Sequence, residues 1–284
     1  MAKRNRQNTN RLIEKRIKDG RGQGKGSEYQ PWLLIQDVAS QGLATRIKGI
    51  KSKRVQHFMS NFELSYFYLL EWSPVIYDIR EQYPLLPLEE TIAIAELAGI
   101  NHPIDPQTKE PIVMTTDFLL TVDQKIDTIE QARTLRQTKD LQSHRTIEKL
   151  EIERLYWQER NIDWGIVTEQ EIPENLVKNL SWLHPYHDLE NLYPLSENDI
   201  QKIKQTLESS MSINNIPLNY LTSECDDRLC LSAGTSLSVV RYLMANRMWI
   251  VSMNECIEPN QPLELISTQK KVTQVNSWKE REVG

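Results

Sequence analysis

The order of helical and strand patterns between residues 57 and 168 leaves few folds open to this chain. Apolar residues recur at three-to-four spacing over 57–72 and predict a helix, which Pro74 would end. Three strand patterns follow, and after them come a long amphipathic helix and a short buried strand. These five elements are expected over 77–83, 113–121, 131–136, 144–160 and 164–168. The order predicts an α/β domain in which helices cover a mixed sheet.

The chain changes character after about residue 172. The patterns that follow are mainly helical, with a strand pair expected near the end. Helices are predicted over 173–183, 197–210 and 237–246, and a strand over 248–252. With 284 residues, the chain is long enough for two ordinary domains. We therefore predict an α/β domain over 57–172 and a smaller, mainly helical domain over 173–284.

The first 60 residues form a basic leader on an otherwise acidic chain. They contain 14 Lys and Arg against 4 Asp and Glu, whereas the remaining residues contain 20 against 35. A flexible cationic segment is typical of an arm that binds a polyanion, although a solvated tail that aids solubility has the same charge. Tyr29, Trp32 and the three aliphatic residues after Trp32 interrupt the basic run. We therefore expect part of the arm, residues 1–56, to pack on the α/β domain.

The composition indicates a folded protein. Hydrophobic residues make up 39% and charged residues 26%, which excludes a fibrous or disordered chain. No apolar run approaches the roughly 18 residues of a membrane helix, and the basic start lacks the apolar segment of a signal peptide. Three cysteines are too few for a disulfide framework. We expect a cytoplasmic protein.

Several motifs of known chemistry are missing or incomplete. The glycine-rich segment GRGQGKGS at 20–27 lacks the spacing and the preceding strand of a phosphate-binding loop. Cys225 and Cys230 have no second cysteine or histidine pair nearby in the sequence to complete a zinc site. We interpret these two cysteines as ordinary thiols.

Two carboxylates in apolar surroundings are the best candidates for chemistry. Glu63 lies between Phe62 and Leu64, and Asp117 lies inside the strand pattern VMTTDFLLT. A carboxylate at the centre of a strand is costly unless it is paired, hydrogen-bonded or bound to a metal. If the two side chains meet, they would bind a hard divalent cation such as Mg²⁺. The alternative is that Glu63 faces solvent and Asp117 pairs with an arginine such as Arg80.

Seven stretches of the chain match one known family. They are RIKDGRGQG, YQPWLLIQDV, SNFELSYFYLLEW, DIREQYPLLP, TDFLL, RTIEKLEIERLYW and the proline-led helix after WGIVTEQEI, and they cover residues 16–183 almost continuously. On these residues the chain resembles TnsA, the endonuclease subunit of multi-subunit cut-and-paste transposases, which include the CRISPR-guided transposons. The resemblance implies a restriction-endonuclease-like fold for the first domain and a winged-helix type for the second.

The resemblance also implies site residues. Glu63 matches the family's helix glutamate, and Asp117 matches the aspartate that binds Mg²⁺. On the next strand the family has a Gln or similar residue, then any residue, then a Lys, and alignment on RTIEKL places Thr134 and Arg136 at these two positions. Residues two apart in a strand share a face, as this chemistry requires.

A second register would use Gln131 and Arg133, and it ranks lower because it displaces the RTIEKL helix. In either register an arginine stands where the family has lysine. Arginine keeps the charge, but it stays protonated and is bulkier, so the exchange is not conservative. This exchange favours a rival hypothesis, in which the protein is a TnsA-like adaptor that binds DNA and its partners without cutting.

The function implied by the resemblance is Mg²⁺-dependent cutting of DNA at the 5′ ends of a transposon. Glu63, Asp117 and the backbone carbonyl of Leu135 would bind one or two Mg²⁺ ions, and Arg136 would contact the scissile phosphate. The leader would follow the DNA backbone without sequence preference. The basic residues expected to do so are Arg46, Lys48, Lys51, Lys53 and Arg54.

The resemblance also implies partners. These are double-stranded DNA at the transposon ends, the transposase TnsB and the ATP-dependent regulator TnsC. The second domain would bind the regulator, and the helix over 237–246 with the strand over 248–252 resembles a recognition helix that leads into a wing. Association with the bacterial nucleoid is expected during transposition.

Overall fold

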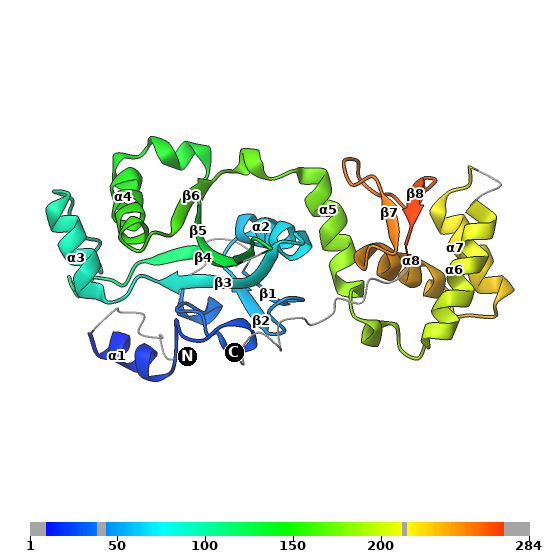
Figure 1. Cartoon of the computed structure of the whole chain (residues 1–284), viewed down its shortest axis with the longest axis horizontal. Helices are drawn as coiled ribbons and strands as arrows, with labels where there is room; N and C mark the ends of the chain where they lie inside the picture. Colours follow the sequence, from blue (N-terminus) through cyan, green and yellow to red (C-terminus); the bar gives the residue numbers. More distant parts are fainter. Residues whose placement is uncertain (1–9, 39–43, 126, 212–214, 270–284) are drawn as a thin grey trace. The chain divides into compact units, whose positions relative to one another are not determined.

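The chain divides into two compact units, Met1–Ile172 and Pro173–Gly284. The computed structural model describes residues 10–38, 44–125, 127–211 and 215–269. Figure 1 shows the helices and strands of both units with their labels. Within the described ranges, no helix is both long enough and apolar enough to cross a bilayer.

A four-stranded mixed sheet forms the centre of the first unit (Figure 1). Its strands are β3 (Ile76–Pro84), β4 (Thr115–Asp123), β5 (Thr128–Leu135) and β6 (Asp163–Val167), which lie side by side in this order. The pairs β3–β4 and β4–β5 are antiparallel, and β5–β6 is parallel. The predicted α/β architecture with a mixed sheet is thereby confirmed. Arg136 follows directly after the end of β5.

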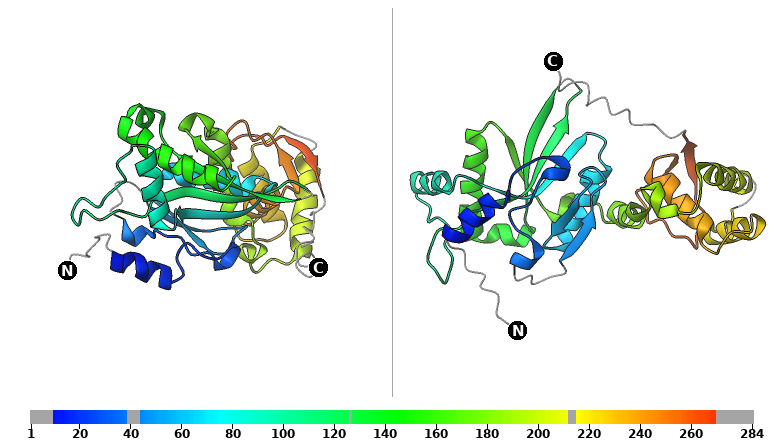
Figure 2. Two further views of the ribbon diagram at one scale, coloured as in Figure 1. Left: turned by 60° about the vertical axis from the view of Figure 1, so that its left-hand side comes forward. Right: turned by 90° about the horizontal axis from the view of Figure 1, so that it is seen from below.

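Helices cover both faces of this sheet (Figure 2). They are α2 (Asn61–Trp72), α3 (Leu88–Leu97) and α4 (His144–Glu159), with short 3₁₀ turns η3 (Thr138–Gln142) and η4 (Glu169–Glu171). Phe118 and Leu120 of β4 belong to the core under α2, whereas Leu119 between them belongs to the core under α3 and α4. Because successive side chains of a strand point to opposite faces, one apolar strand serves both cores.

The first long helix begins later than predicted. Residues 55–58 form the strand β2 (Val55–Phe58), which pairs antiparallel with β1 (Thr45–Lys48). Ser60 caps α2, since its Oγ accepts a hydrogen bond from the backbone N–H of Glu63 at 3.2 Å. The prediction of helix from residue 57 is therefore wrong for its first four residues. Phe58 fits the helical spacing, but it reaches the core from β2.

The basic leader packs on β3 through two aromatic residues. Trp32 is fully buried and its backbone N–H donates to the carbonyl of Gln82 at 3.1 Å, while the Tyr29 hydroxyl donates to the carbonyl of Glu81 at 3.0 Å. Gly22 lies against Pro84 with a φ of +76°, and a Cβ there would lie 2.3 Å from the Pro84 Cγ. The glycine-rich segment is therefore explained by backbone conformation. The helical elements of the leader are α1 (Asn10–Lys18), η1 (Gly26–Glu28) and η2 (Ile35–Asp37).

The second unit is built from helices and one antiparallel strand pair (Figure 1). Its elements are α5 (Glu174–Leu183), η5 (His184–Tyr186), η6 (Leu189–Leu192), α6 (Glu197–Met211), α7 (Leu218–Arg228), α8 (Thr235–Ala245), β7 (Trp249–Val251) and β8 (Leu265–Thr268). The sequence patterns located α5, α6, α8 and β7. Helix α7 was not predicted, because its polar segment SECDDR obscures the apolar face that Leu218, Leu221 and Cys225 bury.

Candidate active site

Asp117 lies on β4 next to the end of β5, and two groups from that end donate to it. The backbone N–H of Leu135 donates to Asp117 Oδ2 at 2.7 Å, and Arg136 Nη1 donates to the same oxygen at 2.9 Å. Arg136 Nη1 also donates to the backbone carbonyl of Leu135. The Asp117 side chain is 12% exposed and that of Arg136 is 33% exposed. Asp117 therefore pairs with an arginine, but this arginine is Arg136 rather than Arg80.

Glu63 occupies the first turn of α2, and its charge interacts with that of Asp117. Its carboxylate accepts hydrogen bonds from the backbone N–H of Met59 at 2.9 Å and from the Ser60 hydroxyl at 3.1 Å. Burial, together with the nearby charge of Asp117, raises the pKa of Glu63 to about 7. The alternative of a solvated Glu63 is therefore not what the structure shows. The two carboxylates identified from the sequence are close enough for their charges to interact.

Arg136 is the cation of this site. Burial alone would lower its pKa, but Asp117, Glu153 and Glu63 together raise the pKa above its ordinary value. The guanidinium is thus charged at any working pH. The negative charges of three carboxylates, each from a different element, thus stabilise the charged form of this one arginine.

Glu153 of α4 is the member of this cluster that the sequence analysis missed. It is only 2% exposed, and its carboxylate accepts hydrogen bonds from the hydroxyls of Thr116, at 2.7 Å, and Thr134. Burial raises the pKa of Glu153 to about 7. A signal was present, because Glu153 lies three residues from both Leu150 and Tyr156, which are on the buried face of α4.

Thr134 lies on β5 as predicted, but its side chain points away from Asp117 and Arg136. The side chain is fully buried, its hydroxyl donates to Glu153, and the indole N–H of Trp164 donates to that hydroxyl at 3.1 Å. The prediction that the side chains of Thr134 and Arg136 share one strand face is therefore wrong for this arrangement. The reason is that β5 ends at Leu135, so Arg136 turns toward Asp117 while Thr134 stays in the layer under α4.

The second register is not supported by the contacts of its residues. Arg133 donates to the carboxylate of Asp163 at 2.6 Å and to the side-chain carbonyl of Gln131 at 3.0 Å. These contacts hold Arg133 against β6 rather than against Asp117. The arginine that meets the acidic pair is Arg136.

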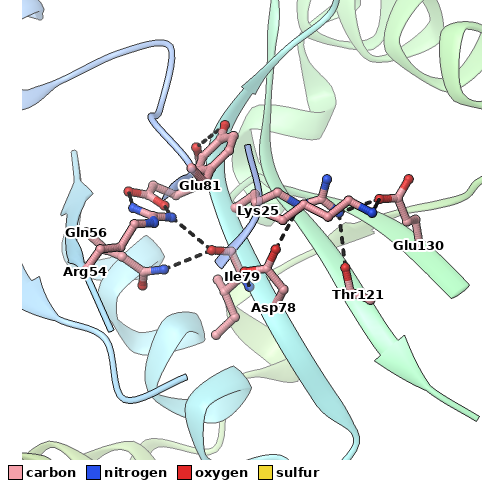
Figure 3. Close-up of polar contacts among 10 residues, drawn as sticks. Lys25, Arg54, Gln56, Asp78, Ile79, Glu81, Thr121 and Glu130 are labelled. Atoms are coloured by element: carbon pink, nitrogen blue, oxygen red, sulfur yellow. Dashed lines mark hydrogen bonds and ion pairs between the residues drawn. The ribbon is translucent and has the colours of Figure 1, made fainter. Parts of the chain in front are cut away.

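Two of the five predicted DNA-binding residues, Arg54 and Lys51, bind groups of the protein itself, and Figure 3 shows the contacts of Arg54. Arg54 donates to Glu81 Oε1 at 2.8 Å and to the carbonyl of Ile79 at 3.0 Å, and its guanidinium lies over the Tyr29 ring. Lys51 Nζ donates to the carbonyls of Ser73 and Ile76 at 2.8 and 2.7 Å. The prediction that Arg54 and Lys51 contact DNA is therefore wrong for these placements. The remaining three are exposed on the β1–β2 hairpin and its turn: Arg46, Lys48 and Lys53.

Arg80, which the alternative interpretation paired with Asp117, belongs to a separate network. It contacts Asp78 at 3.3 Å and Glu130 at 2.6 Å, and Lys25 of the leader approaches the same Glu130 at 3.8 Å. Figure 3 shows these acidic partners on β3 and β5. This network joins the leader to the sheet.

The chemistry of the donor atoms suits a hard divalent cation. The Asp117 carboxylate and the Leu135 carbonyl point at one position, which Arg136 Nη1 holds, and Glu63 lies nearby. Mg²⁺ prefers such oxygen ligands and commonly keeps several waters, so two protein oxygens are sufficient. In the described part of the chain, no three His, Cys, Asp or Glu side chains stand close enough to hold a metal by themselves.

A mixed sheet with buried carboxylates and a cation at one strand end is an arrangement suited to phosphodiester hydrolysis. Two family models match the chain: "TnsA-like endonuclease N terminal" over residues 73–169 and "TnsA endonuclease C terminal" over residues 171–253. The chain is also 38% identical over 270 residues to "Transposon Tn7 transposition protein TnsA" of Escherichia coli, which covers 95% of this chain and 96% of that protein. The chain belongs to the TnsA endonuclease family, and the resemblance noted in its sequence is confirmed.

Proposed function

We propose that this protein is the metal-dependent DNA endonuclease subunit of a Tn7-like transposase and cuts the 5′ ends of the transposon. The observation that carries the proposal is the convergence of Asp117, Arg136 and the Leu135 carbonyl beside Glu63. Membership of the TnsA family supports the reaction class.

Each residue of the site has a distinct task in this proposal. Asp117, Glu63 and the Leu135 carbonyl would hold Mg²⁺, which supplies an activated water and offsets phosphate charge when bound. Arg136 would bind the scissile phosphate, since a guanidinium matches phosphate oxygens in a bidentate manner. Glu153 supports the end of β5 through Thr134, the residue directly before Leu135.

The exposed basic residues would position the DNA. Arg46, Lys48 and Lys53 lie on one hairpin outside the acidic cluster. Contacts from such residues to the phosphate backbone add affinity without sequence preference. Recognition of the transposon end would then belong to a partner.

The partners proposed are the transposase TnsB and the regulator TnsC. In the second unit, α8 and the β7–β8 pair have the order of a recognition helix followed by a wing, and we assign this unit to a winged-helix-type domain that binds the regulator. The setting would be bacterial and nucleoid-associated, and a CRISPR-guided transposon is one such context.

The proposal is tested by cleavage of labelled transposon-end DNA in the presence of TnsB, TnsC and Mg²⁺. Wild type is expected to release the 5′ strand, and Asp117→Ala is expected to release none. Arg154→Ala on the outer face of α4 is a matched control, because Arg154 pairs only with the exposed Glu151 and Gln158 in the contacts seen here. If the wild type assembles with its partners and cuts neither strand end, the adaptor hypothesis replaces this one.

A further inference from the structure

Arg136 lies where two of the three proposed metal ligands converge, the Asp117 carboxylate and the Leu135 carbonyl. A single guanidinium nitrogen, Nη1, donates to Asp117 Oδ2 at 2.9 Å and to the Leu135 carbonyl. A full positive charge thus already sits between two oxygens that a divalent cation would use.

We propose that Arg136 is a tethered cation that competes with the divalent metal, so that the metal binds only after the guanidinium has moved away. This inference rests on the proposed function, because it concerns the ligands assigned there. On this proposal the protein without DNA binds metal weakly, because the guanidinium occupies the metal position.

Electrostatics and shape both support competition. Like charges within a few ångströms of each other repel strongly in a partly buried site. A lysine ammonium is a compact point charge that can lie beside a metal, whereas the planar guanidinium of Arg136 fills more of the space. Simultaneous occupation of Asp117 Oδ2 and the Leu135 carbonyl by both cations is therefore unfavourable.

The exposure of Arg136 shows how the position can be vacated. One third of its side chain is accessible, and both of the bonds described come from Nη1 alone. A DNA phosphate would offer the guanidinium a bidentate partner of its own. Arrival of the scissile phosphate would then draw Arg136 off Asp117 and open the metal position.

The test measures Mn²⁺ binding to the full chain without DNA, by electron paramagnetic resonance titration. Mn²⁺ is the probe because it accepts the same oxygen ligands as Mg²⁺ and its free form is directly visible. The variants are Arg136→Met and Arg136→Lys, and the matched control is Arg133→Met, three residues earlier on β5. Circular dichroism establishes that each variant is folded.

We expect Arg136→Met to bind Mn²⁺ roughly tenfold more tightly than the wild type, or better, with Arg133→Met unchanged. Arg136→Lys keeps the positive charge but lacks the planar guanidinium. Tighter Mn²⁺ binding by this variant as well would show that the guanidinium occupies the metal position, beyond the repulsion that any positive charge there would cause. Adding Asp117→Asn to Arg136→Met should remove the gain, which places the ion at this carboxylate.

Equal Mn²⁺ affinity of the wild type and both Arg136 variants would overturn the inference while leaving the proposed nuclease intact. A gain that survives Asp117→Asn would also overturn it. If neither the wild type nor any variant bound Mn²⁺, the inference would fail together with the metal ligands assigned under the proposed function. End cleavage, which uses a separate assay, distinguishes these cases.

Discussion

Two arginine–carboxylate pairs in the first unit use the same chemical groups for different ends. Arg54 and Glu81 are 8% and 1% exposed, and Arg54 is held by two carboxylate contacts, a backbone carbonyl and the Tyr29 ring (Figure 3). Arg136 and Asp117 are 33% and 12% exposed. The first arginine is held by carboxylate, carbonyl and ring contacts, although its Nε is buried without a hydrogen-bond partner. Both described bonds of the second arginine come from Nη1, which on our proposal lets it leave for a new partner. Burial and the number of contacts thus distinguish a tightly packed pair from a more accessible one.

The comparison predicts unequal losses of stability when each acid is removed. Glu81→Ala leaves a buried, unpaired guanidinium and should lower the free energy of unfolding by about 3–5 kcal/mol. Asp117→Ala leaves a partly exposed arginine, and it should change the free energy of unfolding by about 1 kcal/mol or less. Urea unfolding of both variants measures the difference. Equal losses would show that the two pairs are not different in kind.

Glu153 tests whether a buried acid behind the site acts on the reaction. Glu153→Gln keeps two hydrogen-bond acceptor positions for Thr116 and Thr134 but removes a charge near Arg136. Because residues that support metal ligands typically contribute 10–100-fold, end cleavage should fall by roughly that factor. The urea midpoint should be retained or raised. Full activity of Glu153→Gln would make Glu153 a purely structural residue.

Glu71 sharpens the comparison, because backbone N–H groups help to hold this buried acid. Its carboxylate accepts from the N–H groups of Ile50 and Lys51 at 3.0 and 3.2 Å, and burial raises its pKa to about 7. Between pH about 4.5 and about 7 the folded chain therefore binds more protons at Glu71 than the unfolded chain. This contribution to stability is present below that window and is lost as pH rises through it.

Glu71→Gln removes the titrating group, so its free energy of unfolding should rise relative to that of the wild type as pH rises. The gain between pH 5 and pH 8 is expected to reach at most roughly 3 kcal/mol. Urea unfolding at the two pH values measures it, with Glu151→Gln on the exposed face of α4 as the control. A constant difference between Glu71→Gln and wild type would contradict the raised pKa.

The smallest effect is expected for the exposed basic residues. Arg46→Ala and Lys48→Ala should each lower the salt dependence of DNA binding by about one phosphate contact, measured as the slope of log K against log salt concentration. Lys51→Met should leave the slope unchanged and lower stability, because its ammonium binds the carbonyls of Ser73 and Ile76. A reduced slope for Lys51→Met would return this lysine to the DNA-binding set.

Much of the fold could be predicted because it depends on short-range patterns. Apolar periodicity located the strands that became β3, β4 and β6 and the helix that became α4. Asp117 attracted attention because it interrupts an apolar strand, and Glu63 because it interrupts an apolar helix. Both lie in the site. The start of α2 was misplaced, because Phe58 has the same spacing in either structure.

The amino-acid sequence by itself determined the order of the elements, the two central carboxylates and the family, since each depends on residues close together along the chain. The tertiary structure decided which charged side chains bind other groups of the protein and which remain accessible. Arg54, Lys51 and Thr134 have partners 19 to 30 residues away, and Glu153 binds residues 19 and 37 positions away. Residues so far apart along the chain come into contact only when β3, β4, β5 and α4 pack together. The same packing places Arg136 on Asp117.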